Sequence, residues 1–228
     1  MKYKPETIKA FIINAKNAML EMKNKSNLTV SISKGNIKIG KVMNVSTMPI
    51  LCCGNCGHCA EYCYDIKACY RYAGTMKARA KNTVLAMYHR KEFFAQIDNA
   101  LYHRRNNKYF RWHVAGDILD YEYFEAMISI AKKHPDFKFW TYTKMYSIVN
   151  RWIKLNGELP ENFKCMFSRW EGVKMDNPFK QPEFRVRMEG MSENEFKHLH
   201  KCPGNCDVCK LGNGRGCIGG ETSYVDEH

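Results

Sequence analysis

The sequence predicts an α/β fold, either a partial (βα) barrel or an open parallel sheet, within a single domain. Strand-like and helix-like segments alternate between residues 46 and 190 at the spacing of parallel βα units. A length of 228 residues suits one domain with a sizeable core. The content of 45% hydrophobic and 13% aromatic residues argues against a disordered chain.

Residues 1–45 are expected to form an N-terminal helix and a hairpin. Pro5 opens a run of apolar residues at helical spacing, which residues 24–27 interrupt. Alternating apolar residues then flank Gly35-Asn36, a pattern typical of a β-hairpin.

The βα core is expected to span residues 46–190. A strand within 42–51 delivers a cysteine loop, residues 52–69, at its carboxyl end. The helical pattern of 75–105 is compatible with two helices. Further strands are predicted at 109–114, 137–143, 163–170 and 184–188, with helices from Asp120 to His134 and from Ile148 to Asn156.

Residues 191–228 are polar and then rich in cysteine, which predicts a C-terminal appendage rather than a second domain. Parallel sheets place functional groups at the carboxyl ends of their strands. The cysteine loop and the segment Ala115-Gly-Asp117 both follow predicted strands. We therefore expect these two segments to meet at one edge of the sheet.

Nine of the eleven cysteines fall into two groups, and the pattern C-x-G-N-C-x-x-C occurs in both. Thiolates at such spacing can turn toward one centre, and metal binding supplies the order that a polar loop lacks. The predicted metal ligands are Cys52, Cys53, Cys56, Cys59 and Cys63 in the first group and Cys202, Cys206, Cys209 and Cys217 in the second.

Disulfides and inert core thiols are the alternatives to metal binding. Neither a signal peptide nor an apolar run of membrane-spanning length is recognisable in the sequence, so we expect a cytoplasmic protein that does not enter a membrane. Thiols stay reduced in that compartment, which favours metal binding. Cys69 and Cys165 fit no spacing and are expected to be ordinary thiols.

The spacing favours iron–sulfur over zinc. The run Cys53-x2-Cys56-x2-Cys59-x3-Cys63 matches that of bacterial ferredoxins, except that Tyr64 replaces proline. An alternative register, C-x3-C-x2-C from Cys52, would hold a [4Fe–4S] cluster by three sulfurs and leave one iron open. One or two clusters are expected. Zinc at both groups, or at the second group alone, is the alternative.

The charge of the chain indicates an anionic partner. The formal net charge is +13, and ten Lys and Arg residues between 71 and 111 face only two acidic residues. This basic segment follows the first cysteine group, so nucleic acid or a nucleotide is the expected partner. A merely soluble basic surface is the alternative. The candidate phosphate-binding residues are Arg79, Lys81, Arg90, Arg104 and Arg105.

Three further residues near strand ends are candidate catalytic residues. Asp117 follows the 109–114 strand and is either a cofactor contact or a plain turn residue. His113 is either a proton carrier or a satisfied core histidine. Lys144 ends the next strand and is either a rim cation or a solvated lysine.

The three-cysteine register after a first strand resembles the radical S-adenosylmethionine (radical SAM) enzymes, whose signature is C-x3-C-x2-C. The resemblance implies that Cys52, Cys56 and Cys59 hold the reactive cluster. It also implies S-adenosylmethionine (SAM) as a cofactor, bound by the open iron and, at its amino group, by Gly116 and Asp117.

A second resemblance covers most of the chain. Its segments are Cys59-x3-Cys63-Tyr64, Trp112-His-Val-Ala-Gly-Asp117, Tyr142-Thr-Lys144, Cys202-Pro203 with C-x2-C, and His228. They resemble the gene product 88 family of phages and mobile elements, which implies an origin and a fold but no reaction. The C-x3-C-Y segment of this family includes Cys63, so the resemblance implies Cys63 as a further ligand. Four cysteine ligands at the first cluster would leave no iron open for SAM.

Two functional hypotheses follow. The first is an iron–sulfur enzyme of the radical-SAM-like type that acts on nucleic acid or a nucleotide. The second is a non-enzymatic protein in which iron–sulfur or zinc sites shape a basic surface for nucleic acid. A mobile-element protein that binds a host protein is a third, weaker possibility.

Overall fold

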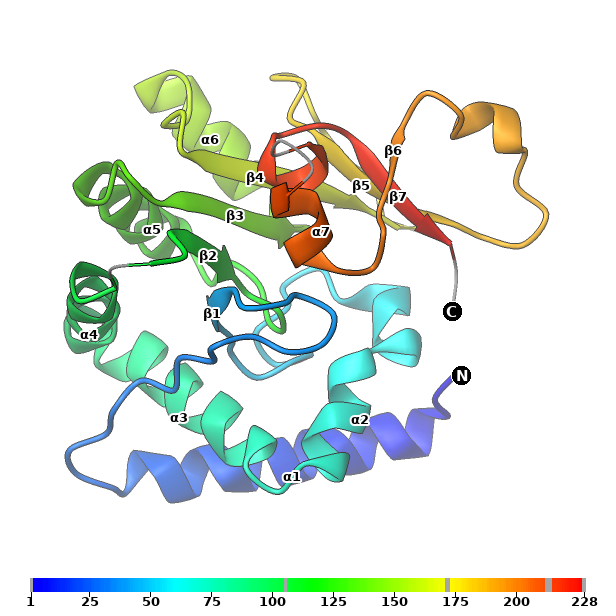
Figure 1. The fold of residues 1–228 in the computed structure, drawn as a ribbon. Coiled ribbons are helices and arrows are strands. Elements are labelled where there is room, and N and C mark those ends of the chain that lie inside the picture. Colours follow the sequence, from blue (N-terminus) through cyan, green and yellow to red (C-terminus); the bar gives the residue numbers. More distant parts are fainter. Residues whose placement is uncertain (1, 105, 171–172, 212–214, 227–228) are drawn as a thin grey trace.

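The computed structural model describes residues 2–104, 106–170, 173–211 and 215–226, and it contains a seven-stranded parallel sheet. The strands follow the order β1-β2-β3-β4-β5-β7-β6, and every adjacent pair is parallel. The predicted α/β class with an open parallel sheet is therefore confirmed (Figure 1). The strands are β1 Met43–Val45, β2 Tyr109–Trp112, β3 Lys138–Thr143, β4 Phe163–Arg169, β5 Glu183–Arg187, β6 His200–Lys201 and β7 Ser223–Asp226.

Local signals set the ends of the helices. Pro5 lies in the first turn of α1, and the Asp120 carboxylate accepts a hydrogen bond from Tyr123 N–H and caps α5. Gly157 ends α6 with a positive φ of 85°. The helices are α1 Pro5–Lys23, α2 Tyr64–Arg71, α3 Thr75–Tyr88, α4 Arg90–Tyr102, α5 Tyr121–Lys133, α6 Tyr146–Asn156 and α7 Cys206–Leu211, with 3₁₀ turns at Gly57–Tyr62, Glu193–Glu195 and Gly216–Ile218.

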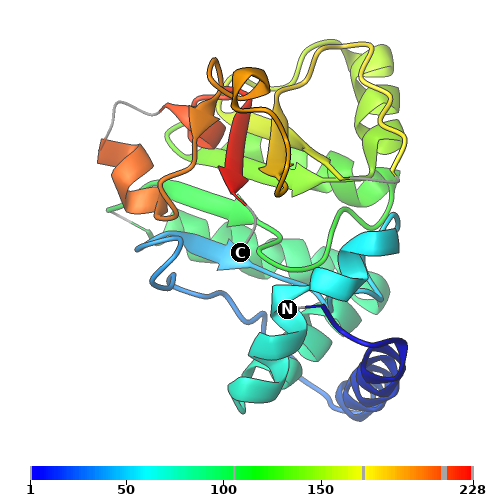
Figure 2. The ribbon, with the colours of Figure 1, turned by 90° about the vertical axis from the view of Figure 1, so that its right-hand side faces the viewer.

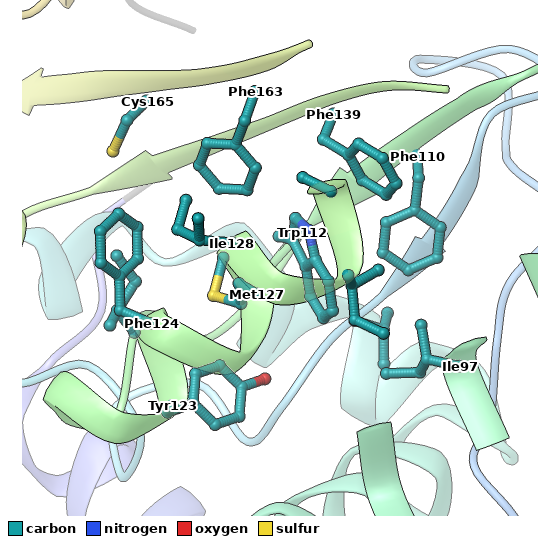
Figure 3. Close-up of a cluster of buried hydrophobic side chains, with 14 of the residues drawn as sticks. Ile97, Phe110, Trp112, Tyr123, Phe124, Met127, Ile128, Phe139, Phe163 and Cys165 are labelled. Atoms are coloured by element: carbon teal, nitrogen blue, oxygen red, sulfur yellow. The ribbon is translucent and has the colours of Figure 1, made fainter. Parts of the chain in front are cut away.

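One face of the sheet packs against α4, α5 and α6 in an aromatic core. Alternate residues of neighbouring strands, such as Phe110, Trp112 and Phe139, point toward the helices, where Met127 of α5 and Ile97 of α4 lie in the same cluster (Figure 3). All five side chains are fully buried. This layer accounts for most of the apolar burial and holds the strand ends in fixed positions.

The other face of the sheet carries Arg111, Trp140 and Tyr142. In the β2–β3 register Arg111 is the neighbour of Trp140, so their side chains share this face. Figures 1 and 2 show α7 on this side, opposite α5 and α6. Trp140 packs there against Ile218 and cysteines of the second group.

The predicted hairpin in the first 45 residues is wrong. The expected first strand bonds to helix side chains: Val30 N–H donates to Gln96 Oε1, and Ser31 N–H donates to Asn82 Oδ1. The expected second strand instead forms a tight turn in which Ile37 is 92% exposed. Side chains of α3 and α4 therefore take the place of a partner strand at Val30 and Ser31, and Ser33 pairs with Asn44 of β1 in a single antiparallel bridge.

The C-terminal segment is part of the sheet rather than an appendage. Strand β7 lies between β5 and β6 and pairs with both. The fold of the described residues from 191 to 226 therefore depends on the core, although the sequence of this segment is polar. Within the described ranges, no helix has both the length and the apolar character needed to cross a bilayer.

Candidate metal centres and the cavity between them

The first cysteine loop follows β1 and lies on the carboxyl ends of β2 and β3. Asn55 Nδ2 donates to the Lys144 carbonyl at 2.6 Å, and Asp117 N–H donates to the Cys52 carbonyl at 3.0 Å. A Cβ atom on Gly54 would lie 2.5 Å from Met145 Sδ, so this glycine allows the close approach. The expected meeting of the cysteine loop with the segment around Asp117 is confirmed.

Four thiols of this loop are neighbours: Cys53, Cys56, Cys59 and Cys63. Cys53 and Cys56 form a hydrogen-bonded pair, which raises the pKa of Cys53 and lowers that of Cys56. Lys144 Nζ lies 3.5 Å from Cys59 Sγ. Burial raises the pKa of Cys63 to about 12.

Cys52 is separated from this set. Its side chain is 3% exposed and lies 3.6 Å from Thr83 Oγ1, within the core formed by α1, α2 and α3. Residues 49–52 form a turn in which Cys52 N–H donates to the Met48 carbonyl, and beyond this turn Cys53 lines the cavity while Cys52 lies in the core. The ligand register that begins at Cys52 therefore does not match the arrangement of the side chains. Cys69 and Cys165 are buried thiols, as predicted.

The second cysteine group comprises Cys202, Cys206, Cys209 and Cys217. Cys206 N–H donates to the Lys38 carbonyl at 3.1 Å, which ties this loop to the turn before β1. Burial raises the pKa of Cys209 to about 11 and that of Cys217 to about 12.

Asparagines of the repeated Gly-Asn pair have the same role in both groups. Asn55 donates its amide to the Lys144 carbonyl, and Asn205 donates its amide to the Ile37 carbonyl. Each cysteine loop is thereby attached to another segment of the chain. Left-handed backbone occurs at Gly204 in the second loop, whereas in the first loop it occurs at Gly57 instead of Gly54.

Both cysteine groups border one cavity of about 380 Å³. It extends from the carboxyl ends of the strands over the face of the sheet that carries α7. That volume is in the range of small-ligand sites. The cavity-lining cysteines are Cys53, Cys59, Cys63, Cys202, Cys206, Cys209 and Cys217.

The donor set of each group suits a thiolate-bound metal. Among the residues that the structure describes, no three His, Cys, Asp or Glu side chains are grouped so that they could hold a metal ion. The groups nevertheless contain four cysteines each, and a lysine amine adjoins the first. Iron–sulfur or zinc at these positions remains a prediction.

A family model described as Gene product 88 matches residues 8–195 of the chain. The chain belongs to the phage gene product 88 family. The match includes the first cysteine group, and the second lies beyond residue 195. No curated protein and no solved structure matches the chain.

Asp117 of this gene product 88 protein holds two strand ends together. Its carboxylate accepts hydrogen bonds from Ile118 N–H, Thr143 Oγ1 and Lys144 N–H at 2.5–2.9 Å. Burial raises the pKa of Asp117, and these hydrogen bonds oppose the rise. Gly116, at φ 84°, leaves space for Thr47, because an added Cβ would lie 1.9 Å from Thr47 Oγ1. Gly116 and Asp117 line the cavity, and their expected contact with SAM stays a prediction.

Lys144 is half-buried at the cavity. Burial lowers its pKa, but the charges of Cys59 and Asp117 raise it further, so the net direction is upward. Lys144 is therefore charged and lies beside the first cysteine group, where it suits a negatively charged centre.

His113 is 3% exposed, lines the cavity and adopts a left-handed φ of 55°. Its Nε2 forms a hydrogen bond with Tyr123 Oη at 3.0 Å, while its buried Nδ1 has no partner. Burial and the charge of Arg111 lower the pKa of His113 to about 3. The ring is therefore neutral at physiological pH, which makes it a poor proton donor there.

We expect the stability of this protein to fall in acid because of His113. The unfolded chain binds a proton on this residue near pH 6.5, which the folded chain does not bind until about pH 3. The contribution of neutral His113 is thus complete above pH 6.5 and is lost as the pH decreases. Between pH 7 and pH 5, the free energy of unfolding should fall by about 2 kcal/mol more in the wild type than in His113→Asn.

Asparagine tolerates the left-handed backbone at this position, so the variant isolates the titration. Urea unfolding of both proteins at the two pH values measures the difference. Equal pH slopes would show that His113 is protonated in the folded protein.

Two of the five predicted phosphate-binding residues are paired with carboxylates. Arg79 forms two hydrogen bonds with the buried Asp65, and Arg90 forms two with Asp120. Lys81 and Arg104 are half-buried, and Arg104 Nε has no partner. Arg105 lies outside the described residues. The four described residues of this set therefore do not form one free basic surface.

Sequence reasoning missed three cavity-lining residues of this gene product 88 protein, namely Arg111, Trp140 and Tyr142. The guanidinium of Arg111 lies over the Tyr142 ring at 4.5 Å. The signal for Arg111 was available, because an arginine between Phe110 and Trp112 in an alternating strand must face the side away from the aromatic core.

Proposed function

We propose that this protein is an iron–sulfur enzyme of the radical-SAM-like type, with metal centres at both cysteine groups beside one substrate cavity. The supporting observation is that both groups line the same cavity, which begins at the carboxyl ends of parallel strands. Two metal sites with a purely structural role would not need to line the same cavity of ligand size.

The first centre would be held by Cys53, Cys56, Cys59 and Cys63. Burial and mutual hydrogen bonding raise the pKa of Cys53, and burial raises that of Cys63, so these thiols bind protons when no metal is present. Metal binding deprotonates such thiols and leaves a centre of negative charge. Lys144 Nζ, 3.5 Å from Cys59 Sγ, stabilises that charge.

The SAM part of the proposal rests on topology. The cysteine loop follows β1, and Gly116 and Asp117 follow β2, so both lie at the carboxyl edge of adjacent parallel strands. A reduced cluster with an open iron supplies the electron for SAM cleavage in such enzymes. In this chain, an open iron requires that only three of the four thiols bind the cluster.

A nucleotide or nucleic acid is the proposed substrate. Trp170 lines the cavity with Tyr62, their ring centroids are 6.3 Å apart, and Lys144 Nζ lies 5.7 Å from the Trp170 ring. Aromatic faces beside a cation favour a stacked base with an attached phosphate.

Anaerobic incubation with SAM and dithionite tests the proposal. We expect 5′-deoxyadenosine to form, and we expect the electron paramagnetic resonance spectrum of the reduced cluster to change when SAM is added. Iron, sulfide and zinc per chain are counted in the same preparation. A protein with iron that forms no 5′-deoxyadenosine and shows no spectral change would contradict the SAM part. A preparation that is folded without any metal would contradict the proposal as a whole.

A non-enzymatic nucleic-acid-binding protein is the second candidate. Lys67, Arg71 and Lys77 are exposed on α2 and α3 and form no ion pair with any residue in the described ranges. Tyr70 and Tyr72 are 52% and 58% exposed beside them. Surfaces that combine basic and aromatic side chains are typical of proteins that bind single-stranded nucleic acid. Salt-dependent binding of DNA or RNA by a protein that does not cleave SAM would favour this candidate.

A further inference from the structure

The cavity contains an excess of positive charge between the two cysteine groups. Of the carboxylates that line it, Asp65 is paired with Arg79, and Asp117 accepts three hydrogen bonds. Arg111 lines the same cavity and forms no ion pair with a carboxylate in the part of the chain that the structure describes. Burying a charged guanidinium in this position costs free energy unless an anion binds beside it.

Unsatisfied nitrogen atoms occur on the face of the sheet that carries α7. Arg111 Nε and Trp140 Nε1 are each buried without a hydrogen-bond partner. Trp140 is fully buried. Both residues line the cavity, and they are neighbours in the β2–β3 register. Buried polar atoms are nearly always bonded in folded proteins, so this cluster indicates a ligand with several acceptor atoms.

The surroundings of Arg111 hold it in place for such a ligand. Its guanidinium stacks on Tyr142 at 4.5 Å. Burial lowers the pKa of Arg111, but the nearby Tyr142, Tyr64, Cys206 and Cys217 raise it, and the group stays charged. A stacked guanidinium keeps its planar set of donors free for two-point recognition of phosphate or carboxylate.

We propose that the cavity between the cysteine groups binds an oxyanion of the substrate, a phosphate or a carboxylate, through Arg111 and Trp140. The inference rests on the proposed function in one respect: it assigns this oxyanion to the substrate of that enzyme.

Calorimetric titration of the anaerobically prepared full chain tests this site. The probes are inorganic phosphate, acetate, AMP and adenosine. Phosphate and acetate distinguish the two kinds of oxyanion, and adenosine is AMP without its charge. We expect AMP to bind at least about tenfold more tightly than adenosine, and Arg111→Gln to abolish that preference, because a charge-assisted hydrogen bond contributes about 10- to 100-fold in affinity.

Two variants control the measurement. Arg185→Gln removes an arginine of the same sheet that is paired with Glu183 and does not line the cavity, and it should bind AMP as the wild type does. Arg111→Lys keeps the charge without the planar donors and should give an intermediate affinity. Circular dichroism of each variant establishes that it is folded.

Metal counts separate this inference from the proposed function. An Arg111→Gln protein that keeps its metal and loses the AMP preference supports the anion site. If instead the variant loses metal from the second cysteine group, Arg111 serves that centre and the inference is wrong. Unchanged AMP binding in the variant, or no binding of any probe by the wild type, also overturns it. A wild type without metal that still binds AMP through Arg111 upholds the inference while the proposed function fails.

Discussion

Cys59→Ser protein purified without oxygen is expected to lack the metal of the first centre, whereas Cys52→Ala protein is expected to keep it. The two residues belong to the same loop, but their side chains have different surroundings. Cys59 lines the cavity beside Lys144, and Cys52 is buried against Thr83. A missing ligand removes the metal and the ordering energy that its binding supplies.

Stability should separate the two variants as well. Cys52→Ala loses one buried sulfur atom and should cost about 1–2 kcal/mol in the free energy of unfolding. Cys59→Ser should lower the melting temperature of the metal-loaded protein, because it removes a ligand that binds only the folded chain. Iron, sulfide and zinc analysis with thermal unfolding measures both effects. Loss of metal in Cys52→Ala with full metal in Cys59→Ser would restore the register that begins at Cys52.

Arg79→Met is expected to destabilise the protein by about 3–5 kcal/mol. The Asp65 side chain is 3% exposed, and Arg79 is its ion-pair partner, with Nε 2.9 Å from Asp65 Oδ2. Removal of the arginine leaves a buried carboxylate without a counter-charge. Asp65 lies in the first turn of α2, two residues after Cys63, so the pair also attaches the first cysteine loop to α3.

The double variant Asp65→Leu/Arg79→Met is the matched control. It removes both charges together and should be within about 1–2 kcal/mol of the wild type, since buried ion pairs contribute little net stability. Urea unfolding of the wild type, the single variant and the double variant measures the coupling. A double variant as unstable as Arg79→Met would show that lost packing, rather than an unpaired charge, causes the effect.

The sequence predicted those parts of the fold that local signals determine. Pro5, Asp120 and Gly157 each lie at a helix end that suits their residue type. The helices that begin or end at these residues were predicted. Apolar alternation located β2, β3 and β4, because these strands are buried and their neighbours in the sheet are also close in sequence.

Non-local contacts account for the failures. Strands β6 and β7 contain two and four residues, and no local pattern says that β7 pairs with β5. The expected hairpin failed because the side chains of Gln96 and Asn82 take the hydrogen bonds that a partner strand would otherwise take. Spacing identified both cysteine groups, and the strand pattern placed the first of them after a strand, but neither told which of two adjacent cysteines faces the cavity.

The position of β7 in the sheet determines the order in which parts of the fold can form during translation. Residues 223–226 pair with β5 on one side and with β6 on the other, so the β5 edge stays open until the ribosome has made them. The first cysteine group, at residues 53–63, emerges far earlier, and β1 to β4 are available to support it. If the first group binds a metal as proposed, that metal can enter before the segment that contains the second group covers the cavity. The second group closes the cavity only after the ribosome has made residues 223–226 of β7.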